Sequence, residues 1–248
     1  MRAAPFVLVP PSQSKATGGT GRYSPRQGVF GGLATPRREV AASLGERLAD
    51  DPARAAKVLG ATGPLLDQAV GATARIVAGT ARALPAARRY EGVVWTHLDV
   101  DGLDADQLGR LLVPSAVVGL STGTDPVPDH RLTFGVALPG LGRLDRWWRP
   151  TLTSALLDHV GDGTIVDLLP NEHAAAFDVD ALAAGTDLVR VRFVSADGGR
   201  AVGHAAKAVK GRVAHAALTG GIRALGRFSW EGWRASRTST GYDVVAPA

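Results

Sequence analysis

The sequence contains no cysteine among its 248 residues. A disulfide framework and a thiolate metal site are therefore excluded, and the absence of cysteine suits a reducing compartment such as the cytoplasm. The six histidines show no spacing typical of metal ligands, and no His-Glu-x-x-His motif is present. We therefore expect no structural metal, and we expect no cofactor.

Long apolar runs are also missing. The longest near-apolar stretches fall well short of the ~18 residues that a membrane-spanning helix needs, and prolines surround the first short apolar run. No Ser-rich or Pro-rich linker divides the chain, and its length suffices for one sizeable core. The sequence therefore predicts a single cytoplasmic domain over residues 1–248, with no signal peptide and no membrane partner.

The positive charge is unevenly distributed. The formal net charge is +5, and residues 186–237 hold ten Lys or Arg against three Asp or Glu. The remainder is slightly acidic, with 18 basic and 20 acidic residues. This asymmetry indicates a polyanionic partner such as DNA, or an anionic small molecule. The alternative is a basic face that is only solvated.

Two helices are predicted from start signals in which a capping residue precedes proline. Thr35-Pro36 begins the first, which ends near Asp50, and Asp51-Pro52 begins the second, which stops at Gly60. A third helix is expected from about Pro64 to Leu84. These three helices would form one helical segment.

The turn between the second and third helices contains Gly60 and Gly63. Glycine-containing hairpins of this kind hold phosphate through exposed N–H groups in helix-hairpin-helix DNA binders. Residues 52–84 are therefore a candidate helix-hairpin-helix-like element, although most such turns only connect helices.

The remaining elements alternate between strands and helices. Phe6 to Val9 forms the first predicted strand, which Pro10 and Pro11 end because proline supplies no ladder N–H group. Further strands are predicted at 93–95, 115–120, 164–169, 188–194 and, at a sheet edge, 242–245. Further helices are predicted at 104–112, 141–159 with an interruption at Pro150, 171–177 and 203–218. The expected class is α/β, a mixed sheet with surrounding helices.

Reactive side chains follow the first strand directly. Ser12 and Lys15 lie on the loop at its end, and glycines follow within 18–21. A Ser-x-x-Lys spacing is also found in acyl-transfer enzymes, but there the serine opens a helix, which the double proline argues against. The alternative is a solvated loop whose lysine neutralises nearby carboxylates.

Two later loops carry further candidates. Asp125, His130 and Arg131 lie in or beside an irregular loop between strands, a usual place for sites. Asn171 and Glu172 follow the 164–169 strand together with an imidazole, which suits acid–base chemistry. Equally, Asn171 can cap a short helix whose dipole favours Glu172 in its first turn.

The 203–218 helix separates its side chains by type. At 100° per residue, His215 lies about 20° from His204 and Lys207 lies about 60° from it on the other side. Lys210 and Arg212 add to the charge of this alanine-rich helix. A helix with so little steric cover suits the approach of a phosphate backbone or an acidic ligand.

Several short motifs stand in a specific order along nearly the whole chain. They are Val9-Pro10-Pro11-Ser12-x-x-Lys15, Val58-Leu59-Gly60, Arg89-Tyr90-Glu91-Gly92-Val93, Asp125-Pro126-Val127-Pro128-Asp129-His130-Arg131-Leu132, Leu138-Pro139-Gly140-Leu141, Trp147-Trp148-Arg149-Pro150, Asp167-Leu168-Leu169-Pro170-Asn171-Glu172-His173 and Lys207-x-x-Lys210-Gly211. In this order and spacing the sequence resembles the YaaA peroxide-stress proteins, in the compact form common in high-GC actinobacteria.

The resemblance implies a single α/β domain of unusual topology, the cantaloupe type, with a positively charged cleft that binds DNA without sequence readout. It also implies protection against peroxide damage, linked to limiting reactive intracellular iron. The nucleic-acid or anion-binding residues expected from the resemblance and the basic helix are Ser12, Lys15, Arg131, Asn171, His204, Lys207, Lys210 and Arg212. Asp125, Gly60 and Gly63 would line or support the cleft.

The chain departs from the family pattern at four places. They are Gln13-Ser14 before the lysine, Val118-Gly119 with Thr122-Gly123, His130 in place of tyrosine, and Thr133-Phe134. Threonine cannot replace the bidentate fork of an arginine at an anion site. A specialised paralogue is therefore the alternative, an enzyme of secondary metabolism that hydrolyses, dehydrates or cyclises an anionic small molecule. Its catalytic residues would be Lys15, His130 and Glu172.

Overall fold

Five neighbouring parallel strands form the centre of the sheet in a computed structural model that describes residues 4–50 and 52–247. Their order is β13 (Gly241–Val245), β10 (Asp187–Val194), β9 (Thr164–Asp167), β1 (Phe6–Leu8) and β4 (Leu111–Ser115). Antiparallel β5 (Gly119–Thr122) borders β4, and the hairpin β11 (Ser229–Trp230)–β12 (Trp233–Arg237) borders β13. The predicted α/β class with a mixed sheet is confirmed.

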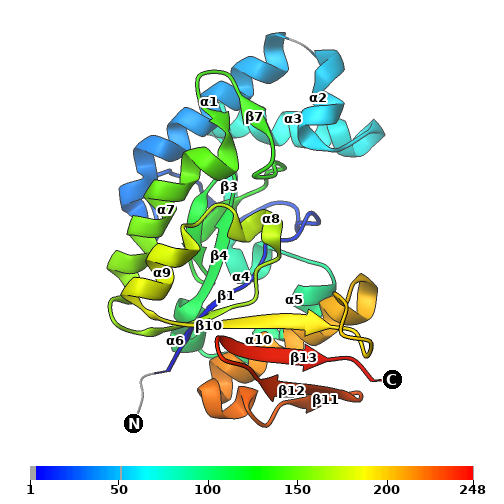
Figure 1. Cartoon of the computed structure of the whole chain (residues 1–248). Helices are drawn as coiled ribbons and strands as arrows, with labels where there is room; N and C mark the ends of the chain where they lie inside the picture. The colour runs from blue at the N-terminus through cyan, green and yellow to red at the C-terminus, as the bar shows by residue number, and fades with distance from the viewer. Residues whose placement is uncertain (1–3, 51, 248) are drawn as a thin grey trace.

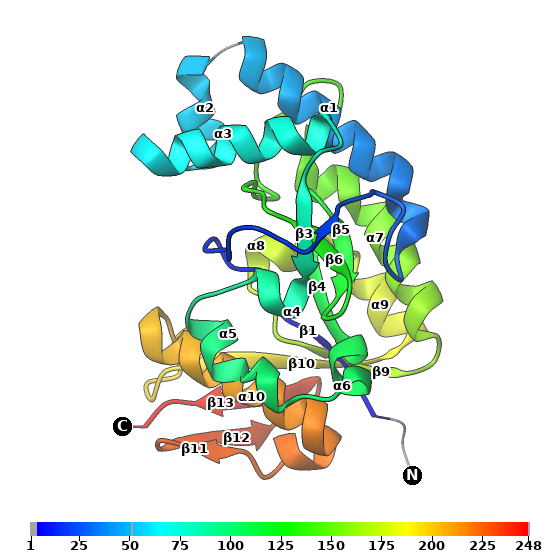
Figure 2. The ribbon, with the colours of Figure 1, turned by 180° about the vertical axis from the view of Figure 1, so that it is seen from behind.

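Helices cover both faces of this sheet. Figure 2 shows α5 (Val93–Leu98) and α10 (Gly203–Leu225) side by side over one face. In Figure 1, α1 (Ala34–Asp50), α7 (Leu144–Val160) and α9 (Val179–Gly185) lie on the other side. The sequence explains this layering, because successive side chains of a strand point to opposite faces.

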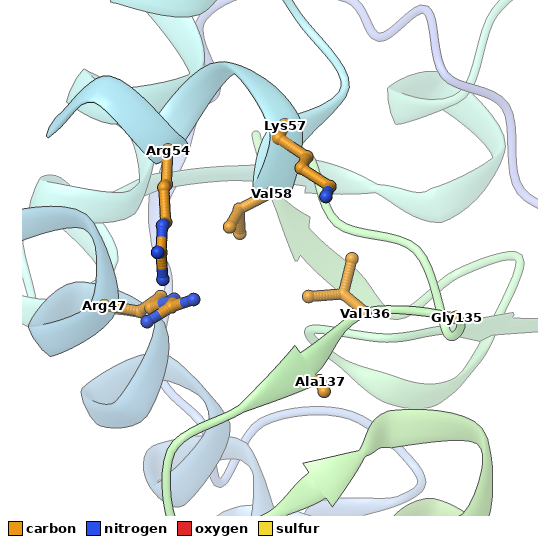
Figure 3. A pocket seen from close by; sticks show the side chains of 7 residues that line it. All are labelled: Arg47, Arg54, Lys57, Val58, Gly135, Val136 and Ala137. Atoms are coloured by element: carbon orange, nitrogen blue, oxygen red, sulfur yellow. The ribbon is translucent and has the colours of Figure 1, made fainter. Parts of the chain in front are cut away.

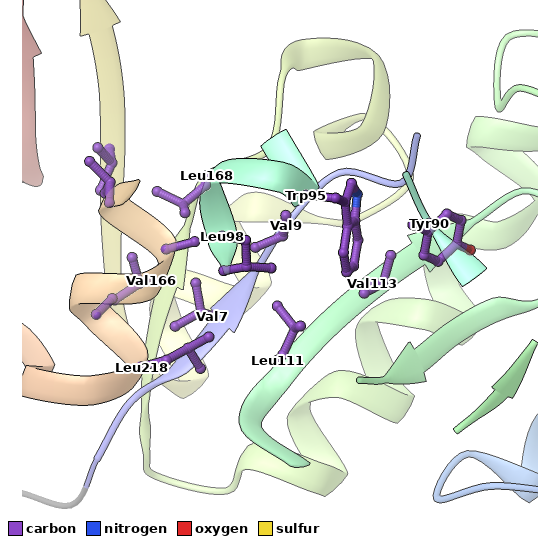
Figure 4. Close-up of a cluster of buried hydrophobic side chains, with 14 of the residues drawn as sticks. Val7, Val9, Tyr90, Trp95, Leu98, Leu111, Val113, Val166, Leu168 and Leu218 are labelled. Atoms are coloured by element: carbon purple, nitrogen blue, oxygen red, sulfur yellow. The ribbon is translucent and has the colours of Figure 1, made fainter. Parts of the chain in front are cut away.

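Strand β1 shows this alternation clearly. Val7 and Val9 pack with Leu98 and Leu218 beneath α5 and α10, as Figure 4 shows. Leu8 instead joins the cluster beneath α1 and α7. Because both faces of β1 are buried, the strand is apolar throughout, as parallel strands between helical layers usually are.

The helical segment and two small sheets complete the fold. Helices α2 (Pro52–Leu59) and α3 (Gly63–Val77) lie at the end of α1, at the top of Figure 1. A three-stranded sheet consists of β2 (Gly21–Arg22), β3 (Arg82–Pro85) and β6 (Pro126–Pro128), and β7 (Ala137–Leu138) pairs with β8 (Gly142–Arg143). The shorter helices are η1 (Gly31–Leu33), α4 (Ala86–Arg89), η2 (Val100–Gly102), α6 (Ala105–Arg110) and α8 (Asn171–Ala174).

Two predicted strands are wrong. Residues 93–95 begin helix α5, whose buried Trp95 and Leu98 stand three residues apart on one helical face. The predicted 115–120 strand contains a turn, because Ser115 ends β4 and the chain reverses into β5. Gly119 permits this reversal with φ 76°, and a Cβ atom there would lie 2.9 Å from the Trp148 ring.

Several boundaries and positions also differ from the sequence-based expectation. The first helix begins at Ala34, so Thr35 lies inside it and is not its cap. The third helix ends at Val77, because Gly79 adopts φ 65° and the chain enters β3. Helix α7 continues through Pro150, because Trp148 and Leu152 on either side are buried and hold this part of the helix against the core. Strand β13 is not at the edge, because β12 pairs with it. The predicted cap Asp51 lies outside the described residues.

One predicted helix start is confirmed in detail. The Asp104 carboxylate accepts from the Gln107 backbone N–H, and the Gln107 side chain accepts from the Asp104 N–H, which forms a capping box. Within residues 4–50 and 52–247, no helix combines the length and the apolar character needed to cross a membrane.

Candidate functional site

A pocket of about 100 Å³ lies where the carboxyl ends of β1, β4 and β9 meet. Open α/β sheets usually bind ligands at this edge, because the loops that leave neighbouring parallel strands converge there. The lining residues are Pro11, Ser12, Gln13, Lys15, Leu59, Gly60, Ser115, Ala116, His130, Arg131, Leu132, Thr133, Phe134, Glu172 and His173. The pocket therefore brings together six of the residues predicted from the sequence: Ser12, Lys15, Gly60, His130, Arg131 and Glu172.

The loop after β1 holds Lys15 against the body of the protein. Its Nζ donates to the Ser12 carbonyl oxygen at 2.8 Å and lies 5.6 Å from the centre of the Tyr90 ring. Burial lowers the pKa of Lys15 to about 8, and the charge of Asp129 opposes this effect. Lys15 is therefore a cation at pH 7 whose charge is poorly solvated.

His130 is buried and has a fixed hydrogen-bond pattern. Its Nδ1 lies 2.9 Å from the Pro128 carbonyl oxygen, and its Nε2 lies 2.9 Å from Ser115 Oγ. A carbonyl oxygen only accepts, so Nδ1 carries the proton and Nε2 accepts from the serine hydroxyl. Burial, together with the charge of Lys15, holds the pKa of His130 well below its ordinary value. The ring is therefore neutral at pH 7.

Arg131 connects this pocket to the helical segment. Its guanidinium donates to the carbonyl oxygens of Leu59 and Gly60 and to Gln13 Oε1, at 2.8 to 2.9 Å. These three partners carry no formal charge, so the positive charge of Arg131 persists at the pocket wall. Gln13 is one of the departures from the family pattern, and here it is a direct partner of Arg131.

Helix α8 brings the third wall of the pocket. Its N-cap is Pro170, so the interpretation of Asn171 as a cap is wrong. Asn171 and Glu172 are exposed, and only Glu172 reaches the pocket. Burial and the charge of Lys210 lower the pKa of His173 to about 4. Its Nδ1 is buried without a hydrogen-bond partner among the described residues.

The basic residues of α10 lie beyond His173, outside the pocket lining. Lys210 is half-buried with its Nζ 5.1 Å from the Phe193 ring centre, and burial lowers its pKa to about 8. Lys207 and His204 are exposed on the same helix. Arg212 turns toward β11, where its guanidinium lies 6.0 Å from the Trp230 ring centre. The structure thus places Lys210 beside the pocket and Arg212 away from it.

Asp125 and Gly63 do not line the pocket. The Asp125 carboxylate accepts from the backbone N–H groups of Val29 and Thr122 at 2.9 Å and is buried, so it joins the loop at Val29 to the end of β5. Gly60 and Gly63 both adopt positive φ, 57° and 56°, which lets the chain turn between α2 and α3. Their role in this structure is to shape the helical hairpin.

A larger pocket of about 540 Å³ lies between the helical segment and the β7 loop. Figure 3 shows Arg47 of α1 and Arg54 and Lys57 of α2 around its opening, with Val136 opposite. Charge patterning of the sequence did not single out these cations, because they lie outside the basic 186–237 segment. They give the end of the helical segment a basic surface of its own.

Ser115 is the site residue that sequence reasoning missed. It is 2% exposed and follows Pro114 in an apolar run. Such a run predicts a buried strand and no functional residue. Only the turn after β4 reveals its pairing with His130. Tyr90 is also part of this surrounding, since its ring lies edge-on to His130 at 6.1 Å. The Arg89–Val93 motif was the one signal that pointed to Tyr90.

Known proteins resemble this chain over nearly its whole length. A sequence model of the family described as Peroxide stress protein YaaA matches residues 6–239. A UPF0246 protein of Streptomyces coelicolor is 37% identical over 222 residues, which cover 87% of this chain and 84% of the relative. A UPF0246 protein of Corynebacterium efficiens is 33% identical over 220 residues, covering 86% and 85%. With a family match of this extent and relatives above 30% identity, the chain belongs to the YaaA peroxide stress protein family.

Proposed function

We propose that this protein is a cytoplasmic peroxide-stress protein that binds nucleic acid through its phosphates, without reading base sequence. The observation that carries the proposal is the placement of Lys15 and Lys210. Both are half-buried lysines with a pKa of about 8, and the charge of each acts on a histidine that lines the same pocket. A bound phosphate would relieve the poor solvation of both charges.

We infer that the cations around the pocket together form an extended region of positive potential. Lys15 influences His130, Lys210 influences His173, and Lys207 and Arg200 influence Lys210. Two carboxylates, Asp129 beside Lys15 and Asp167 beside Lys210, raise the lysine pKa values but do not cancel the effect of burial. An extended anion gains more from such a region than a single small ion does.

The helical segment offers a second set of cations on the same chain. Arg54 and Lys57 are exposed on α2, and Arg131 holds the turn that follows this helix. Phosphate contacts of this kind set affinity and register but carry no base information. No base-reading element is needed for the proposed function.

Salt dependence of duplex DNA binding tests the proposal. Each phosphate contact that is lost reduces the slope of log K against log salt by about 0.9. The variant Lys207→Ala with Lys210→Ala should therefore reduce the slope by about 1.8 and weaken binding at all sequences. The matched control is Arg223→Ala with Arg227→Ala, which removes the same charge from two exposed positions, one in the last turn of α10 and one just after it.

The comparison of the two double variants separates location from net charge. Lys207 lies near the start of α10, whereas Arg223 lies beyond the break at Gly221, where φ is 64°. If both variants bind DNA as tightly as the wild type, or if affinity is independent of salt, the proposal is wrong. If both weaken binding equally, net charge alone explains it and the Lys210 region is not the site.

A second candidate is an enzyme that acts on an anionic small molecule. The size of the pocket favours it, because about 100 Å³ holds roughly three waters and no nucleotide. Titration with inorganic phosphate, followed by thermal unfolding, tests whether a small anion binds there. Phosphate at about 100 times its Kd would stabilise the wild type by about 2.7 kcal/mol, and Lys15→Ala should lose that gain. Equal stabilisation of both proteins would contradict binding at this pocket.

A further inference from the structure

The hydrogen bonds around Ser115 hold its hydroxyl group, a candidate nucleophile, next to the His130 ring, a candidate base. The Pro128 carbonyl oxygen takes the His130 Nδ1 proton, and the bare Nε2 accepts the Ser115 hydroxyl proton at 2.9 Å. This fixes the imidazole tautomer that a serine nucleophile requires, in which the ring nitrogen that faces the hydroxyl is unprotonated. A backbone carbonyl here orients the ring, the task that a carboxylate performs in other serine–histidine pairs.

The backbone next to Ser115 favours negative charge on its oxygen. The N–H groups of Val117 and Val118 point at Ser115 Oγ from 3.3 and 3.4 Å, from the turn that joins β4 to β5. The Tyr90 hydroxyl lies close to Ser115, is buried, and makes no hydrogen bond of good geometry with a described residue. Burial raises the pKa of the Tyr90 hydroxyl and Ser115 opposes this rise, so the phenol is a polar neighbour of the Ser115 oxygen.

The rest of the pocket defines what reaches this serine. Lys15 and Arg131 present positive charge, and His173 presents a buried nitrogen without a partner among the described residues. A volume of about 100 Å³ admits a reacting group of only a few non-hydrogen atoms. A short acyl group bonded to a negatively charged leaving group fits both the positive charge and the small volume of the pocket.

We propose that Ser115 is a catalytic nucleophile and His130 its base, and that together they transfer a short acyl group from an anionic acyl donor to water. Ser115 Oγ bonds to the acyl carbon while its proton moves to His130 Nε2. The bond between the acyl carbon and the leaving group breaks, and the leaving group departs with the electron pair and takes the proton from His130. Water then repeats the attack on the acyl-serine and releases the carboxylic acid.

Acetyl phosphate is the probe, because it is small, anionic and an acyl donor. Treated wild-type protein should gain one acetyl group, which peptide mass mapping places at Ser115 and which hydroxylamine removes because it is an ester. Acetyl groups on lysine, Lys15 included, resist hydroxylamine. Release of phosphate beyond one equivalent per chain would show that water completes the cycle.

Two variants examine the pair. Ser115→Ala should lose the hydroxylamine-sensitive acetyl group, and His130→Gln should slow its formation about 100-fold, the usual contribution of a general base. Circular dichroism checks that both variants fold. If either variant does not fold, the position of the acetyl group in the wild-type protein still decides between Ser115 and other residues. Two results would overturn the proposal. One is that every acetyl group found on the wild type resists hydroxylamine, and the other is that Ser115 in His130→Gln is acetylated as fast as in the wild type. DNA binding by Ser115→Ala is a separate readout, so nucleic-acid binding and acyl transfer fail independently.

Discussion

The Arg131 guanidinium donates to the Gly60 carbonyl oxygen over 2.9 Å, and this contact ties the pocket wall to the turn between α2 and α3. The same side chain reaches the Leu59 carbonyl oxygen at the end of α2. A helix leaves its last carbonyl oxygens without intrahelical partners, and here a charged side chain supplies them. The position of the helical segment therefore depends on a residue that also lines the candidate site.

Loss of this contact should loosen the helical segment. Arg131→Ala removes hydrogen bonds from a charged donor to the α2 end and to Gln13, so we expect the unfolding free energy to fall by about 2 kcal/mol. Hydrogen exchange should accelerate most over residues 52–77. Arg146→Ala, which removes an exposed arginine of α7, is the matched control. Equal exchange of this segment in both variants would contradict the role given to Arg131.

Anion affinity should decrease as pH rises through 8. Lys15 and Lys210 both have a pKa of about 8, so both are mostly charged at pH 7 and mostly neutral at pH 9. We expect DNA affinity, measured by fluorescence anisotropy at fixed salt, to fall across this range. Bound phosphate raises both pKa values, so the fall will lie somewhat above pH 8. The double variant Lys15→Met with Lys210→Met should bind weakly and show little pH dependence from 7 to 9. A wild-type affinity that is constant from pH 7 to 9 would contradict the assignment.

The same lysines should reduce the stability of the fold. The folded-state pKa of Lys15 lies below the unfolded-state value, so the unfolded chain binds the proton more tightly between pH 8 and 10.5. This unfavourable contribution is fully present below pH 8 and disappears as the pH rises to 10.5. Lys15→Met should therefore raise the unfolding free energy at pH 7 by about 1 kcal/mol, and the melting temperature by about 2–4 °C. A lower melting temperature for this variant would show that the Lys15 charge is stabilising.

The sequence predicted the layers of the fold better than its turns. The strands at 6–9 and 188–194 and the helix start at Asp104 depend on neighbouring residues, and they were predicted from the sequence. The turn after Ser115 was not, because Gly119 is explained by its packing against Trp148, a residue far along the chain. Propensity favours a strand there, and tertiary contact decides otherwise.

The candidate site was predictable only in part, for a similar reason. Ser12, Lys15 and Glu172 follow strands directly, so parallel topology brings them to one edge. The Ser115–His130 pairing depends on a backbone carbonyl, which no side-chain motif reports. Arg89 is another such case, since it is fully buried and holds the Gly-rich loop through the Ala16 and Gly18 carbonyl oxygens. Its sequence position suggested only a family motif.

His173 should make the protein sensitive to acid. Its folded-state pKa of about 4 lies below the ordinary value near 6.5, because burial and the Lys210 charge oppose protonation. Stability is therefore present above pH 6.5 and is lost as the pH falls toward 4, where the unfolded chain binds the proton first.

For this single half-buried ring we expect a loss of about 2 kcal/mol across that range, measured by urea denaturation at several pH values. His173→Gln should show a correspondingly shallower decline, while His204→Gln, which removes an exposed histidine of α10, should follow the wild type. Phosphate bound beside His173 would raise its pKa and protect the wild type from acid, but not the His173→Gln variant. An identical decline in the wild type and both variants would place the acid sensitivity elsewhere in the fold.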